Sequence, residues 1–245
     1  MTPVDAALLF VGGCVAGVIN AMAGGGSTLT IPLLVLAGVP GVVANGTNRV
    51  GILASSITTW ASFRREGVAI DLRSIKHILI PAFFGAAVGA FGVSQVTNDA
   101  FERGFGLLII PIVILTIRKP RITAAEDRWS IPLTVAVFFA IGIYAGAIQA
   151  GVGLLLVAAL NRNGFDLVTA NTIKVIFTVA ATLIALPIFI TQGNVRWLPG
   201  LVLAVGLCIG GWLGARFAVR GGEKLIRYVM IVAALTLAAK LLGLF

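Results

Sequence analysis

Long apolar runs fill most of this chain and leave it few possible folds. The runs cover about 4–23, 28–38, 42–63, 77–95, 101–117, 131–150, 152–160, 166–190, 197–215 and 225–244. Most approach the roughly 20 residues that a helix needs to cross a bilayer, although those at 28–38 and 152–160 are too short. Only 11% of the residues are charged and 59% are hydrophobic, whereas soluble domains carry about 25% charged residues. The sequence predicts an all-α polytopic membrane protein, because a transmembrane β-barrel would alternate polar and apolar residues.

The net charge of +9 gathers in short clusters between the apolar runs. This distribution follows the positive-inside bias of membrane proteins, so we expect a lipid bilayer and no nucleic acid as the partner of this charge. The basic clusters at 64–76, 118–128 and 216–227 are placed on the cytoplasmic side, and the cation-poor loops at 97–99 and 191–194 outside. Both termini are then predicted outside, and the first run is read as a retained span because no basic segment precedes it.

Two halves of the chain match each other at a constant spacing. Gly17 pairs with Gly142, Gly26 with Gly151, Thr47 with Thr172, Arg49 with Lys174, Val50 with Val175, Gly85 with Gly210, Gly89 with Gly214 and Ala90 with Ala215. Each pair differs by 125, as in 172 − 47. We predict one transport unit made of repeat one at 1–120, a cytoplasmic linker at 121–130 and repeat two at 131–245.

Matched loops of the two halves carry opposite charge character, which predicts that the repeats have inverted topology. Inversion requires an odd number of crossings in each repeat. About five helical segments satisfy it whether the short one crosses the bilayer or forms a re-entrant hairpin. Many secondary transporters follow this plan, with broken helices and the substrate site near mid-membrane.

The run Gly24-Gly25-Gly26 interrupts the first apolar segment. Three glycines favour a helix break, after which Ser27, Thr28 and Thr30 are predicted to cap the next helix, with Pro32 tolerated if it lies in the first turn. The alternative is tight helix packing through small residues. We expect the turns at 24–27 and 151–153 to face each other near mid-bilayer and line one cavity.

Arg49 and Lys174 occupy matched places inside apolar segments. Arg49 lies 15 residues before Arg64, about 22 Å of helix from the cytoplasmic boundary. A cation at the bilayer centre costs about 2.5–3.5 kcal/mol, and no carboxylate in these segments is an obvious partner. A transported anion would supply the missing charge. The alternative is that the cations snorkel or bond to free carbonyls at the broken helices.

The candidate substrate-binding residues cluster around the breaks and the two cations. They are Arg49, Lys174, Asn48, Thr47, Ser27, Thr28, Asn171, Thr172, Gly25, Gly26, Asn20, Gln149 and Gly151. We predict no metal site and no cofactor, because Cys14 and Cys208 are solitary and read as packing residues. We also expect no enzyme activity, since the sequence offers no buried nucleophile–base pair.

The chain resembles the sulfite exporter TauE/SafE family over essentially its whole length. The resemblance is carried by Gly24–Gly26, Ala44–Arg49, Ala170–Lys174, Gly214–Arg216 and Lys224–Arg227. It implies a carrier in the bacterial inner membrane that exports small sulfur-containing anions, such as sulfite or organosulfonates, by alternating access around a central cationic site. A passive anion channel or a carrier of another small anion is the alternative, and a second copy in a homodimer is a candidate partner.

Overall fold

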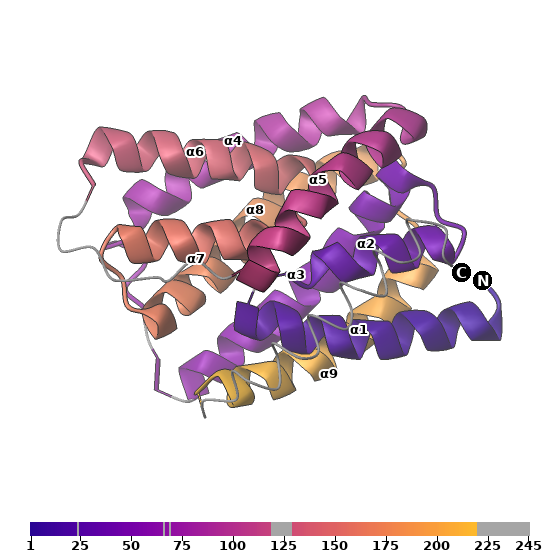
Figure 1. Cartoon of the computed structure of the whole chain (residues 1–245), viewed down its shortest axis with the longest axis horizontal. Helices are drawn as coiled ribbons and strands as arrows, with labels where there is room; N and C mark the ends of the chain where they lie inside the picture. The colour runs from indigo at the N-terminus through magenta and orange to yellow at the C-terminus, as the bar shows by residue number, and fades with distance from the viewer. Residues whose placement is uncertain (24, 66, 69, 119–128, 220–245) are drawn as a thin grey trace.

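The computed structural model describes residues 1–23, 25–65, 67–68, 70–118 and 129–219. In these residues the chain folds into helices joined by short loops (Figure 1). The helices are α1 (Pro3–Ala23), α2 (Ser27–Leu36), α3 (Gly41–Arg65), α4 (Lys76–Ser94), α5 (Asn98–Arg118), α6 (Ile131–Ala147), α7 (Val152–Arg162), α8 (Leu167–Thr191) and α9 (Trp197–Val219). The all-α prediction is confirmed for this part of the chain.

Four of the described helices, α1, α4, α8 and α9, are long and apolar enough to cross a membrane. The short helices α2 and α7 were expected from the brevity of their apolar runs, and they contain 10 and 11 residues. The expected helix at 225–244, most of the linker at 121–130 and the Lys224–Arg227 motif lie outside the described residues.

Two helix pairs form the long sides of the molecule, α1 with α9 and α4 with α6 (Figure 1). Both pairs pack through glycines that let the backbones touch. A Cβ on Gly214 would lie 2.7 Å from the carbonyl oxygen of Val18, and one on Gly142 would lie 2.9 Å from the Cα of Ala82. Small residues at helix crossings are the usual way in which membrane helices approach closely.

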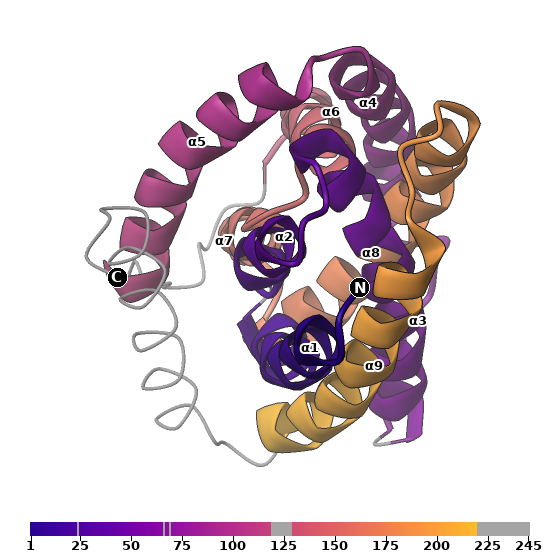
Figure 2. The same ribbon diagram turned by 90° about the vertical axis from the view of Figure 1, so that its right-hand side faces the viewer.

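The helices within each of these pairs run parallel to each other. Along α9, Gly206, Gly210 and Gly214 meet α1 at Phe10, Cys14 and Val18 in turn. Along α6, Gly142 and Gly146 meet α4 at Ala82 and Ala86. Seen from the end, the short helices α2 and α7 lie between the α1–α9 pair and the α4–α6 pair (Figure 2).

The first predicted break is confirmed, since α1 ends at Ala23 and α2 begins at Ser27. The chain turns back, so that α2 runs along α1 in the opposite direction. A Cβ on Gly26 would lie 2.5 Å from the Ala16 carbonyl oxygen, and Leu33 packs over Gly12. Gly26 has helical angles, φ −57° and ψ −36°, so this glycine is needed for close packing against α1. The break and the small-residue contact therefore occur together.

The predicted hydroxyl caps of α2 are wrong. Gly26, which has no side chain, is the N-cap residue of α2, and no side-chain hydrogen bond caps the helix there. Thr28 instead donates its hydroxyl to the Gly25 carbonyl, and Thr30 donates to the Asn48 side chain at 2.6 Å. Pro32 lies inside α2, beyond its first turn. These hydroxyls therefore link the turn to α2, and α2 to α3.

The second break lies slightly earlier than the predicted 151–153. Gln149 and Gly151 both have positive φ, 63° and 71°, and α7 already begins at Val152. The Tyr144 hydroxyl donates to the Ala150 carbonyl at 2.6 Å and closes the turn. A non-glycine residue in the left-handed region costs about 1–2 kcal/mol, so the fold holds Gln149 in a strained conformation.

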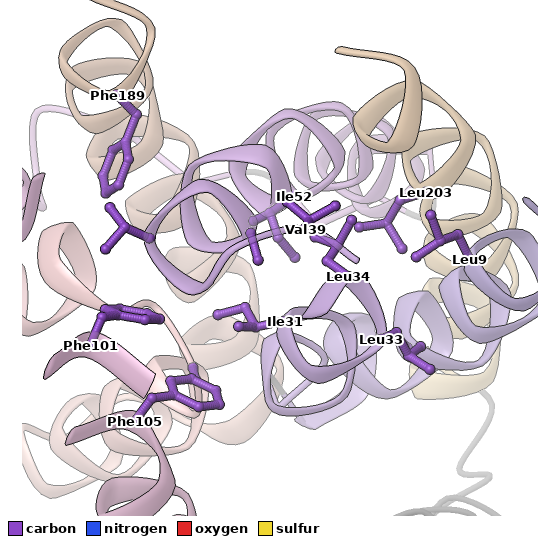
Figure 3. Packing of buried hydrophobic residues seen from close by; sticks show 14 of the residues in the cluster. Leu9, Ile31, Leu33, Leu34, Val39, Ile52, Phe101, Phe105, Phe189 and Leu203 are labelled. Carbon is purple, nitrogen blue, oxygen red and sulfur yellow. The ribbon is translucent and has the colours of Figure 1, made fainter. Parts of the chain in front are cut away.

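A cluster of buried apolar side chains joins α2 to its neighbours (Figure 3). The cluster unites Ile31 and Leu34 of α2 with residues of α1, α3, α5, α8 and α9, which include Leu9, Ile52, Phe101, Phe105, Phe189 and Leu203. At the start of α3, the Gly41 N–H donates to the Glu102 carboxylate and the Val42 N–H to the Asn98 side chain, each at 3.0 Å. Side chains of α5 thus cap the N-terminal end of α3. This cap fixes the position of α3 and of the polar face that α3 carries further along the helix.

Candidate functional site

The polar face of α3 carries Asn45, Asn48 and Arg49, and all three are fully buried. Asn45 and Arg49 are four residues apart and therefore lie on the same side of the helix. Asn48 points instead to α2, where it accepts the hydrogen bond from Thr30. The face thus lies against both α2 and the end of α6.

Arg49 caps the C-terminal end of α6. Its Nη1 donates to the Ala145 carbonyl at 3.2 Å, and its Nη2 donates to the Gly146 carbonyl. Asn45 donates to the next carbonyl, that of Ala147, at 2.7 Å. One face of the guanidinium covers the Phe189 ring, with 4.7 Å between Cζ and the ring centroid. The last carbonyls of a helix lack partners within the helix and carry partial negative charge, so a cation is stabilising there.

Lys174 does the same for the end of α1. Its ammonium donates to the carbonyls of Asn20 at 2.8 Å and Ala21 at 3.4 Å, and to the side-chain oxygen of Asn171. Asn171 adds a donor of its own to the Ala21 carbonyl at 2.9 Å. Lys174 is only 2% exposed. The alternative in which the cations bond to free carbonyls at the broken helices is therefore present in the structure.

These two caps obey the 125-residue spacing of the sequence. Arg49 and Lys174 are matched residues, and so are their acceptors, because 145 − 20 and 146 − 21 both equal 125. Each cation comes from one half of the chain and closes a helix of the other half. Arg49 and Lys174 therefore tie the two halves together.

The two cations do not share one place. Phe189, which Arg49 covers, lies 15 residues further along α8 than Lys174 (189 − 174), about 22 Å of helix. A sulfite or sulfonate head group spans only a fraction of that distance. The expectation that one anion touches both Arg49 and Lys174 does not fit this geometry.

The two breaks also lie at different levels along the helices. The loop between α8 and α9 sits at the start of α3, because the Arg196 N–H donates to the Thr47 hydroxyl at 2.9 Å. The end of α4 lies there too, since Asn194 donates to the Ser94 carbonyl at 3.4 Å. Because α6 runs parallel to α4, the break after α6 lies nearer to the end of α4. Because α1 runs parallel to α9, the break after α1 lies nearer to the end of α9, away from the α8–α9 loop. The turns are therefore not at one level, and the expectation that they line one cavity stays a prediction.

Several predicted donors are already committed to local structure. Thr172 donates to the Val168 carbonyl within its own helix at 3.0 Å, and Thr47 accepts from the Arg196 N–H. Gln149 donates to the Thr182 hydroxyl at 2.8 Å. Asn20 enters the arrangement through its backbone carbonyl. The other candidates beside the first break are Ser27, Thr28, Gly25 and Gly26, which lie in the turn and first residues of α2.

Four buried polar atoms of this region have no hydrogen-bond partner among the described residues. Two are donors, Arg49 Nε and Asn48 Nδ2, and two are acceptors, Asn45 Oδ1 and Gln149 Oε1. An unpaired buried polar group costs about 1–3 kcal/mol. Unpaired buried groups call for a partner beyond the described side chains, such as an ordered water, an ion or a ligand. No group of His, Cys, Asp or Glu in the described residues could hold a metal ion.

The helix that carries Lys174 begins at a strong N-cap. Asp166 accepts from the backbone N–H groups of Val168 and Thr169, both at 3.0 Å. Hydrogen bonds from the side chain and backbone of Thr169, and then from Val168, hold the pKa of Asp166 below its usual range. The negative side chain also suits the positive end of the helix dipole. The start of α8, and with it the height of Lys174, is thereby fixed.

Sequence reasoning found Arg49 and Lys174, and one of its two alternatives named free carbonyls at the broken helices as their partners, without naming the residues. Phe189 and the carbonyls of residues 145–147 were not predicted, and Thr30 was expected to cap α2 instead of contacting Asn48. Backbone acceptors have no residue type of their own, so no motif reveals them. The 125-residue register held the one usable signal, because it matches the two cations with each other and the two breaks with each other.

Comparison with known proteins identifies the family. A family model described as sulfite exporter TauE/SafE matches residues 9–241. A protein of Haemophilus influenzae named "Probable membrane transporter protein" is 30% identical over 242 residues, which cover 96% of this chain and 93% of that protein. "Probable membrane transporter protein YfcA" of Escherichia coli K12 is 30% identical, covering 99% of this chain and 91% of its own length. No solved structure matches. The chain belongs to the sulfite exporter TauE/SafE family.

Proposed function

We propose that this protein is a secondary carrier that exports small sulfur-containing anions, such as sulfite or organosulfonates, across the bacterial inner membrane. The observation that carries the proposal is the pair of buried cations. The partners that the structure gives Arg49 and Lys174 are carbonyls, an amide oxygen and an aromatic ring, and none of these bears a full negative charge.

The charge balance at these sites favours an anionic substrate. A helix C-terminus offers the equivalent of about half a negative charge, so each cap leaves part of its cation uncompensated. Charged groups without full compensation are costly inside a membrane and usually mark a substrate or ion pathway. A sulfonate presents three acceptor oxygens, which suit the fixed fork of a guanidinium better than the two coplanar oxygens of a carboxylate.

Alternating access between two inverted repeats is the mechanism that we propose for transport. It is supported by the matched caps and by the antiparallel arrangement of α3 and α8, in which the α8–α9 loop lies beside the start of α3. In carriers of this plan, the two halves rock against each other around the site. The cross-half contacts of Arg49 and Lys174 join the parts that such a motion would displace.

Flux measurements in proteoliposomes test the carrier proposal. We expect the initial uptake of labelled sulfite to saturate with concentration, and unlabelled sulfite inside the vesicles to accelerate it by counterflow. Ethanesulfonate should compete at concentrations about tenfold lower than acetate does. A rate that rises linearly without counterflow would show a passive channel instead. Liposomes prepared without protein give the background.

Cysteine labelling tests the inversion of the repeats. Ser74 and Gln192 are exposed residues of loops that correspond to each other in the two halves. In a background where Cys14 and Cys208 are replaced by alanine, we expect Ser74→Cys to react only from the cytoplasmic side and Gln192→Cys only from outside. Labelling of both from one side would disprove the inverted topology.

A further inference from the structure

We infer that the anion binds to Arg49 and Asn48 on α3, whereas Lys174 is a helix cap that does not contact it. This inference rests on the proposed function, because it names the atoms that hold the proposed substrate. It separates two cations that the sequence presents as equivalent. The difference lies in how many of their donors are already used.

Every donor of Lys174 has an acceptor. An ammonium group has three N–H bonds, and the structure gives it three oxygens, those of Asn20, Ala21 and Asn171. The Asn171 side chain is also occupied on both sides, since its amide nitrogen donates to the Ala21 carbonyl. An anion could bind at this end only by breaking bonds that hold the end of α1.

Arg49 keeps one edge of its guanidinium free. Its Nη1 and Nη2 donate to the α6 carbonyls, and the Phe189 ring covers one face of the group. Its Nε is buried and has no partner among the described residues. A guanidinium has five N–H donors in a fixed plane, so the edge that carries Nε can accept an anion while the cap of α6 stays intact.

Asn48 supplies a second free donor at the same level of α3. Its side-chain oxygen accepts from Thr30, and its Nδ2 is buried without a described partner. Consecutive residues differ by only about 1.5 Å along a helix axis, so the two side chains leave α3 at nearly one height, Asn48 toward α2 and Arg49 toward the end of α6. Two unpaired donors, one of them charged, match the oxygens of one sulfite or sulfonate group.

Charge-conserving exchanges at the two cations test this assignment. We expect Arg49→Lys to lower the affinity for ethanesulfonate at least tenfold, because lysine can still cap the carbonyls but lacks the second donor edge. Lys174→Arg should keep the affinity within about twofold of the unmodified protein. Dissociation constants are measured by titration calorimetry on detergent-purified, monodisperse protein, with sulfite as a second probe.

A second matched pair keeps the test decisive if either exchange misfolds. Asn48→Asp removes the free donor and adds a negative charge, so we expect at least a tenfold loss of ethanesulfonate affinity. Asn171→Asp makes the same change beside Lys174 and should change the affinity less than threefold. Equal losses within each pair, or larger losses on the Lys174 side, would overturn the inference. If the unmodified protein binds neither probe, the proposed function itself fails.

Discussion

Gly89→Val is expected to separate α4 from α6 and to lower stability by more than about 3 kcal/mol. A Cβ at this position would overlap the carbonyl oxygen of Ile143 and lie 2.8 Å from its carbonyl carbon and 2.9 Å from the Ala147 nitrogen. These are backbone atoms of a packed helix and cannot rotate away, so overpacking here exceeds the usual 1–3 kcal/mol. The melting temperature in detergent should fall by roughly 6–12 °C.

Gly92→Val is the matched control on the same helix. A Cβ on Gly92 meets no atom within 4 Å, so the larger side chain only covers exposed surface. We expect its melting temperature and size-exclusion profile to equal those of the unmodified protein. If both valine variants melt alike, the close contact between α4 and α6 does not contribute to stability as argued.

Lys174→Met is expected to destabilise the protein by about 3 kcal/mol. The change removes three hydrogen bonds and leaves the carbonyls of Asn20 and Ala21 with fewer partners at the buried end of α1. Each unpaired group costs about 1–3 kcal/mol, and the relief of burying a charge offsets part of the sum. Because this end joins the two halves, the loss should also appear as faster proteolysis near the first break.

Thr178→Val provides the comparison for Lys174→Met. Thr178 is one turn from Lys174 and donates only to the Lys174 carbonyl within the same helix, at 2.8 Å. Its replacement keeps the shape and should change the melting temperature by less than about 2 °C. A Lys174→Met variant that melts at or above the temperature of the unmodified protein would mean that the cost of burying the charge exceeds the benefit of the cap.

The helix boundaries could be predicted from the sequence because polar clusters end the apolar runs. The run at 42–63 stops at Arg64-Arg65, and α3 ends at Arg65. The run at 166–190 stops before the polar loop at 191–194, and α8 ends at Thr191. In a membrane every backbone group must be paired within the segment. Long apolar runs therefore become helices whatever their other features.

The arrangement of the breaks could not be predicted in the same way. The run Gly24–Gly26 predicts that a helix stops there, but it does not predict the direction in which the chain continues. The direction of α2 depends on how closely α2 can approach α1, and Gly12 and Gly26 permit this close approach. Placing both turns at the same depth was an analogy with other carriers, and the packing of α1 on α9 and of α6 on α4 overrides it.

The reciprocal caps impose an order on synthesis. Arg49 leaves the ribosome before the carbonyls of Ala145 and Gly146, so α6 meets its cap as soon as it inserts. The end of α1 must wait for Lys174, which is 153 residues later (174 − 21). At 5–20 residues per second, that is about 8–30 s with the Ala21 carbonyl uncapped. The nascent first half therefore carries one uncapped helix end and one cation without its acceptors until the second half has been made.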